Sequence, residues 1–65
     1  MPYPARDRLD RYIQAGDMLE VGQAPACRVF LHRGEFCFVW RGRIERARDY
    51  FSNSIEIVER ADEHL

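Results

Sequence analysis

Arginines crowd the stretch from residue 40 to residue 48, which reads WRGRIERAR. Ile44, Ala47, Tyr50 and Phe51 fall at helical spacing, so the arginines are predicted to lie at the start of a helix. Arginines at a helix N-terminus oppose the helix dipole and cost stability unless an anion binds there. Free backbone N–H groups, the flexible Gly42 and the guanidinium groups would then converge on that anion. The pattern predicts a site for a nucleic-acid phosphate or for a carboxylate cluster on a protein partner.

The competing interpretation is that the arginines are neutralised within the chain. Residues 49–65 hold an excess of acidic side chains, and four of these could fold back onto the arginines: Glu56, Glu59, Asp62 and Glu63. If the arginines are free for a partner instead, the contact surface would also include one face of the preceding hairpin. The predicted partner-binding residues are Arg28, Phe30, His32, Arg41, Arg43, Arg46 and Arg48.

The cysteines and histidines give weaker indications of chemistry. Cys27, His32 and Cys37 are evenly spaced by five residues. A structural zinc site usually needs four ligands, often in close CxxC pairs, and His64 is a poor fourth. A Cys37 nucleophile with His32 as its base would lack an oxyanion hole, a Gly-rich phosphate loop and a substrate cleft. We therefore expect no enzymatic activity, no metal and no cofactor, and free thiols rather than a disulfide.

Charge is distributed unevenly along a chain whose formal net charge is −1. Residues 26–48 carry six arginines against two glutamates, whereas residues 49–65 carry one arginine against five acidic residues. A basic middle and an acidic end either pair within one molecule or offer faces to different partners. A dedicated nucleic-acid binder would carry a clear positive excess, which this chain lacks.

The elements that must position these residues are predicted from periodicity. Apolar side chains recur at the spacing of one helical face between Pro4 and Ala15, and Gly16 follows as a stop. Asp7 stands four residues before Arg11, which adds an ion pair along that helix. A short strand is expected next, over residues 18–21.

The strongest local pattern is a hairpin over residues 27–40, in which two β-rich runs flank Arg33 and Gly34. A two- or four-residue turn gathers apolar side chains on one face, in the pairs Leu31 with Phe36, Val29 with Phe38 and Cys27 with Trp40. The opposite face is then mixed and carries Arg28, Phe30, His32, Glu35, Cys37 and Val39. A three-residue turn is the alternative, because arginine is ill suited to the positive φ of a type I′ turn. The first register is preferred because it separates apolar from polar residues better.

The second predicted helix begins near Ile44 and extends to Phe51. Residues 54–65 are ambiguous between a helix and an edge strand, with the strand narrowly preferred because its β-branched residues alternate with polar ones. The predicted fold class is therefore α+β. It is a single domain of residues 1–65 with a three- to four-stranded antiparallel sheet, centred on the hairpin, and two helices on one face.

The small size of the chain bears on its function. A chain of 65 residues buries only about 60% of its surface on folding, so a partner or a second copy would add needed stability. No apolar run approaches the roughly 18 residues that span a bilayer, and no signal-peptide pattern is present, so a cytoplasmic protein is expected.

The leading hypothesis is a small non-enzymatic interaction protein that binds a protein or nucleoprotein partner. It would act as an adaptor or inhibitor, of the kind that phages and mobile elements encode. The alternative is a nucleic-acid-binding module that contacts phosphates with the same arginines. Self-association into a homodimer, through an uncovered sheet edge or through opposite charges, is compatible with either hypothesis.

Overall fold

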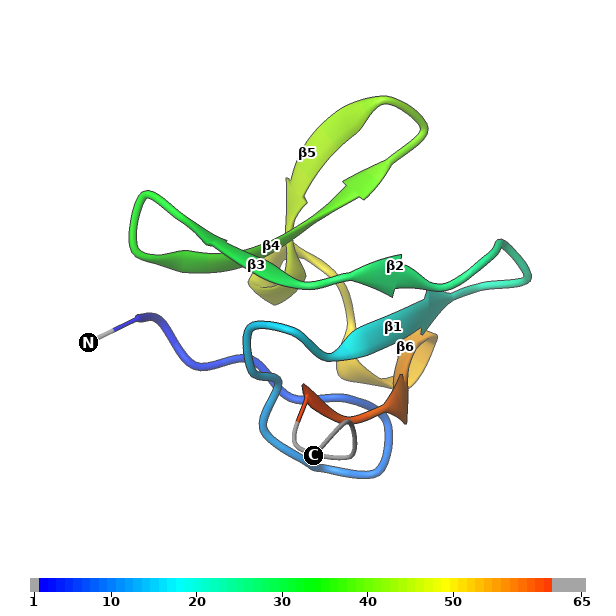
Figure 1. Ribbon diagram of the computed structural model, residues 1–65. Helices are drawn as coiled ribbons and strands as arrows, with labels where there is room; N and C mark the ends of the chain where they lie inside the picture. Colours follow the sequence, from blue (N-terminus) through cyan, green and yellow to red (C-terminus); the bar gives the residue numbers. More distant parts are fainter. Residues whose placement is uncertain (1, 62–65) are drawn as a thin grey trace.

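The computed structural model describes residues 2–61 and shows an all-β architecture (Figure 1). The predicted α+β class is wrong, because residues 2–61 contain no α-helix and the named helical elements are two three-residue 3-10 turns. No helix in residues 2–61 has the length and apolar character to cross a membrane. The elements in chain order are β1 (Met18–Val21), β2 (Cys27–Arg28), β3 (Phe30–His32), β4 (Glu35–Trp40), β5 (Arg43–Arg46), η1 (Ala47–Asp49), η2 (Ser52–Ser54) and β6 (Ile55–Glu59).

The strands form two three-stranded antiparallel sheets, in the orders β2-β1-β6 and β3-β4-β5. One stretch of chain joins them, because β2 and β3 are separated only by Val29. The Val29 N–H donates to the Asp17 carbonyl and its own carbonyl accepts from the Gly16 N–H, each at 2.8 Å. The predicted single sheet is thus divided where the chain passes from β2 to β3, as Figure 1 shows.

The predicted hairpin register is confirmed where β3 meets β4. Leu31 lies opposite Phe36, and Arg33 and Gly34 form the two-residue turn with φ of 53° and 77°. Two consecutive positive φ values define a type I′ turn, whose twist matches that of the flanking strands. The prediction fails at its far end, because Cys27 belongs to the other sheet and pairs with Leu19 of β1.

The first predicted helix does not form. Asp7 accepts hydrogen bonds on its carboxylate from the backbone N–H groups of Leu9 and Arg11, and Asp10 adopts a φ of 63°. Side chains that bond nearby backbone groups offer the chain an alternative to the helical ladder. The predicted ion pair between Asp7 and Arg11 exists, at 2.8 Å, but it closes an irregular loop.

The second predicted helix is replaced by a second hairpin. Arg41 and Gly42 repeat the type I′ turn, with φ of 52° and 77°, and direct the chain back along β4 as β5. Pairing with β4 over four residue positions therefore overrides the helical periodicity after residue 43. For residues 54–65, the preferred strand is confirmed over Ile55–Glu59, and residues 62–65 lie outside the described part of the chain.

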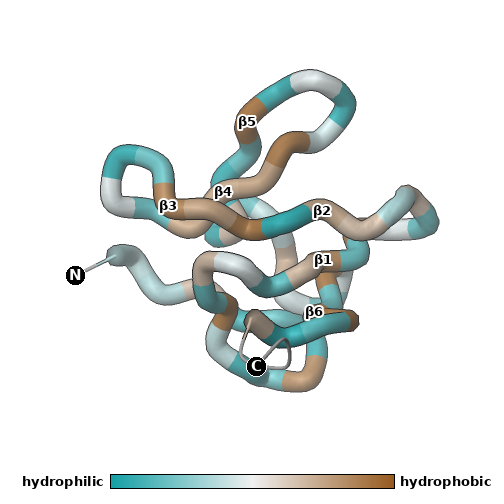
Figure 2. The backbone as a smooth tube through the Cα atoms, in the orientation of Figure 1, coloured by the Kyte–Doolittle hydropathy of each residue, from teal (hydrophilic) through white to brown (hydrophobic). Residues whose placement is uncertain are grey.

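The core lies between the two sheets. Phe38 of β4 is fully buried there, and the Tyr50 ring packs against it with 5.3 Å between centroids. The hydropathy-coloured tube shows the contrast between tan-to-brown β4 and the teal turns beyond both of its ends (Figure 2). The buried core residues are Ala5, Ile13, Leu19, Val21, Val29, Phe38, Ala47, Ile55 and Ile57.

The N-terminal loop covers the outer edge of β6 with side chains as well as backbone. The Arg8 N–H donates to the Ile55 carbonyl, and the Ile57 N–H donates to the Asp7 carboxylate. The Ile57 carbonyl accepts from the Arg11 guanidinium at 2.7 Å. The Asp7–Arg11 pair thus satisfies both backbone groups of Ile57, as a neighbouring strand would.

Candidate interaction surface

The sheet β3-β4-β5 turns one face toward the core and the other toward solvent. Phe36, Phe38 and Trp40 of β4 pack on the core cluster, so the alternate residues of the strand point outward. Residues paired across neighbouring strands share a face, which extends the pattern to β3 and β5. We call this surface the outer face; it consists of Phe30, His32, Glu35, Cys37, Val39, Ile44 and Arg46.

The outer face combines an exposed apolar pair with a polar hollow. Val39 and Ile44 lie directly opposite each other on β4 and β5 and are 51% and 52% exposed. Beside them is a hollow of about 280 Å³, lined by His32, Arg33, Glu35, Cys37, Ile44 and Arg46. An apolar centre with a polar, charged rim is the usual composition of a protein-binding surface.

Cys37 is buried at 1% exposure, although it belongs to the outer face. Burial first, and the nearby Glu35 second, raises the pKa of the Cys37 thiol. Its Sγ lies 4.0 Å from the backbone carbonyl of His32. A raised pKa disfavours the thiolate, which is the reactive form of a cysteine. Cys27 is also a free thiol and is only partly buried.

Two of the predicted partner-binding arginines are neutralised inside the chain. The Arg46 Nε donates to Asp49 at 2.8 Å, and Arg46 also lies 3.6 Å from Glu35. Arg48 pairs with the same Glu35 and lies over the Tyr3 ring, 4.5 Å from its centroid. Internal pairing therefore occurs through Glu35 and through Asp49, the first residue of the acidic segment, whereas Glu56 pairs with Arg8. Asp62 and Glu63 lie outside the described residues.

The other predicted residues have different surroundings. Arg28 belongs to the other sheet and donates to the Gly16 carbonyl at 3.0 Å. Phe30 and His32 lie edge to face, with 6.2 Å between ring centroids. Arg41 lies over the Trp40 ring, 5.3 Å from its centroid. The structure brings Phe30, His32 and Arg46 onto one face and leaves Arg28 apart from them.

Three further arginines lie in or beside the two turns: Arg33, which was not predicted, Arg41 and Arg43. Arg43 is opposite Trp40, so its side chain lies on the other face of the sheet from the outer face. No carboxylate within residues 2–61 forms an ion pair with any of the three. Arg33 and Arg41 each occupy the first position of a type I′ turn, at the two ends of β4. The signal in the sequence is the Arg-Gly pair, which occurs twice, eight residues apart. We call Arg33, Arg41 and Arg43 the turn arginines.

Comparison with known proteins identifies no relative. No protein-family model, no curated protein and no solved structure matches this chain. The candidate site therefore rests on the geometry of the chain itself.

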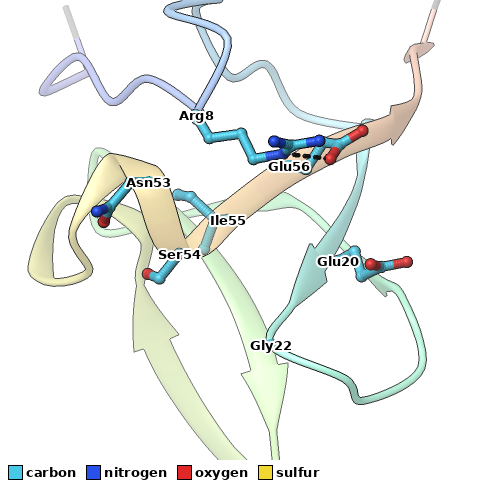
Figure 3. Close-up of a pocket in the computed structure, with 7 residues that line it drawn as sticks. All are labelled: Arg8, Glu20, Gly22, Asn53, Ser54, Ile55 and Glu56. Carbon is cyan, nitrogen blue, oxygen red and sulfur yellow. Dashed lines mark hydrogen bonds and ion pairs between the residues drawn. The ribbon is translucent and has the colours of Figure 1, made fainter.

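A second hollow, of about 340 Å³, lies on the other sheet and is drawn in Figure 3. Glu20 of β1 and Glu56 of β6 are directly opposite each other, and Arg8 pairs with Glu56. Like charges at opposed positions repel, and the Arg8 guanidinium reduces that repulsion. No cluster of three or more His, Cys, Asp or Glu within the described residues could hold a metal ion. This hollow shows an ion pair and no catalytic arrangement.

Proposed function

We propose that this chain is a small non-enzymatic interaction protein that binds a larger protein through its outer face and the turn arginines. The observation that carries the proposal is the pair of arginines held at positive φ. A non-glycine residue in the left-handed region costs about 1–2 kcal/mol, and asparagine or glycine would avoid most of that cost. Strain of this kind is concentrated at functional positions. Two guanidinium groups that form no ion pair within residues 2–61, beside an exposed apolar pair, fit a partner that offers carboxylates around an apolar side chain.

A protein partner is supported over nucleic acid by the surroundings of the aromatic rings. Binding of single-stranded nucleic acid relies on rings free to stack on bases. Phe30 is engaged edge-on by His32, and the Trp40 ring lies under Arg41. We place the interaction in the cytoplasm, a setting consistent with the two free thiols.

The first test uses a photo-crosslinking amino acid at one exposed position on each sheet. Val39 on the outer face and Val58 on β6 are 51% and 47% exposed, which makes Val58 a matched control. In extract from the source cell, the Val39 probe is expected to form an adduct with a larger protein, and the Val58 probe is not. Equal labelling from both positions would contradict the proposed surface.

The turn arginines are tested in the same assay with the double substitution R41A/R43A. We expect this variant to lose at least about 90% of the Val39 adduct, because each charge-assisted bond to a partner carboxylate contributes about 1.5–3 kcal/mol. Its thermal stability should be unchanged or slightly raised. The matched control is R6A, which removes an exposed arginine from the N-terminal loop. If R41A/R43A were to unfold at lower temperature and retain the adduct, the arginines would be structural.

The alternative function, nucleic-acid binding, is tested by a separate measurement. Fluorescence anisotropy with labelled single- and double-stranded DNA and RNA is measured at about 50 and 200 mM salt, because phosphate contacts weaken sharply across that range. We expect no tight binding at either concentration. Tight binding that falls steeply with salt would replace the protein partner with nucleic acid and assign the turn arginines to phosphates.

A further inference from the structure

β5 has an open outer edge whose free backbone groups are determined by the hairpin. Trp40 and Arg43 close the two-residue turn, so they exchange hydrogen bonds. Alternation along an antiparallel pair then directs the N–H and C=O groups of Ile44 and Arg46 away from β4. No hydrogen bond from residues 2–61 satisfies the N–H and C=O groups of Ile44. Arg46 is the N-cap of η1, and the first i→i+3 bond of that turn uses its carbonyl. β5 also stands at the periphery of the fold in Figure 1.

The outer edge of β6, in contrast, is covered by the N-terminal loop. There, the Asp7–Arg11 pair satisfies both backbone groups of Ile57. Nothing equivalent covers β5 in the described part of the chain. Unpaired strand edges readily accept another strand.

We propose that two copies of this chain pair antiparallel through their β5 edges, with Ile44 of one copy opposite Ile44 of the other. Both Ile44 residues present their N–H and C=O groups outward, so this central pair exchanges two hydrogen bonds. The proposal goes beyond the function above, because it concerns a second copy of the chain and an edge of the sheet rather than its outer face.

Several registers would preserve the two-fold symmetry of the pair of strands. The charges of β5 favour the one centred on Ile44. Centring on Ile44 places each Arg43 opposite Glu45 of the second copy, which gives two attractive cross-strand pairs. Arg46 then meets Gly42 of the second copy, which has no side chain. The neighbouring registers instead place Arg43, Glu45 or Arg46 opposite its own counterpart, and like charges directly opposite are destabilising. The segment Arg43-Ile44-Glu45 is thus self-complementary in one register.

Pairing in this register has a consequence for the outer face. The two sheets β3-β4-β5 would join into one sheet, with the Val39–Ile44 pairs of both copies in a continuous apolar strip across the two-fold axis. A dimer would therefore present two copies of the proposed binding surface side by side and bind a repetitive partner with increased avidity.

Charge reversal tests the register. In R43E, glutamates would face glutamates across the axis, and in E45R, arginines would face arginines. Neither residue has an ion-pair partner within residues 2–61, apart from this proposed contact, so folding should be retained and is checked by circular dichroism. Light scattering after size exclusion and native mass spectrometry are run at about 10 µM to 1 mM protein. The wild type is expected to dimerise, and each single variant to dimerise at least about tenfold more weakly.

The decisive samples are the double variant R43E/E45R and an equimolar mixture of the two single variants. Both restore opposite charges at each cross-strand pair, so both should recover dimers, and the mixture should form the heterodimer in preference to either homodimer. Hydrogen exchange at the Ile44 amide should also slow as the protein concentration rises. A wild type that is monomeric at the highest concentration would overturn the proposal. Dimers that persist in both single variants would overturn it too, because the contact would then lie elsewhere. These outcomes do not depend on extract proteins, so they are separate from those of the crosslinking test.

Discussion

At the scale of single residues, Asp7 stabilises the fold through contacts that its position in the sequence does not predict. Its carboxylate is 1% exposed and accepts hydrogen bonds from three backbone N–H groups and from the Arg11 guanidinium. One of those donors, Ile57, is fifty positions away along the chain. A buried carboxylate is tolerated when its charge is paired and its lone pairs are satisfied, and Asp7 meets both conditions.

We predict that D7N destabilises the protein by about 3 kcal/mol, because the substitution leaves the Arg11 guanidinium without its buried charge partner. The free energy of unfolding in urea measures the change. D10N is the matched control: the side chain of Asp10 is 78% exposed, and asparagine tolerates its positive φ, so the change should stay within about 0.5 kcal/mol. Equal costs for the two substitutions would show that Asp7 has no special role.

At the scale of elements, the two Arg-Gly turns determine how β3, β4 and β5 pair with one another. Both turns are type I′ and contain two residues, which fixes the registers of β4 against β3 and β5. The sequence predicted the first turn and its register from the alternation of apolar residues. It did not predict the second, because Ile44 and Ala47 fit a helical period as well as they fit a strand and a following 3-10 turn.

We predict that R33N raises the free energy of unfolding by about 0.5–1 kcal/mol, because asparagine adopts the left-handed conformation at less cost than arginine. R41N should gain less, because it also removes the contact between Arg41 and the Trp40 ring. For a domain of this size the midpoint of thermal unfolding of R33N should rise by about 2–8 °C. The reverse control is G34A, which places a Cβ at a φ of 77° and should lower stability. A loss of stability in R33N would mean that the arginine side chain makes stabilising contacts and is not there for a partner.

At the scale of the whole molecule, the N-terminal loop and the two sheets are held together by charged groups as well as by the apolar core. The Asp7 carboxylate joins the loop to β6, and this has a consequence for the pH dependence of stability. Burial by itself raises the pKa of the Asp7 carboxyl. The hydrogen bonds from Ile57 and Arg11 together outweigh burial and bring that pKa below the ordinary value of 3.8.

A lowered folded-state pKa means that Asp7 stabilises the fold fully above its unfolded-state pKa. The contribution is lost as pH falls through the folded value. We therefore predict that the free energy of unfolding is flat near neutrality and declines below about pH 5, continuing to fall beneath pH 3.8. Urea denaturation from pH 7 to pH 2 measures this. D7N should show a shallower acid decline than the wild type, and an identical decline would assign the acid sensitivity to other carboxylates.

The sequence by itself determined the hairpin over β3 and β4, the strands β1 and β6, and the clustering of arginines around one sheet. Each of these depends on neighbours in the chain: a period of two, a turn of two residues, or a local excess of charge. Only the tertiary structure decided that Arg46 and Arg48 pair with Glu35 and Asp49, and that no carboxylate within residues 2–61 pairs with the turn arginines. It also decided against both helices. Local periodicity competes there with long-range bonds, and bonds such as that from Ile57 to Asp7 leave no trace in the spacing of nearby residues.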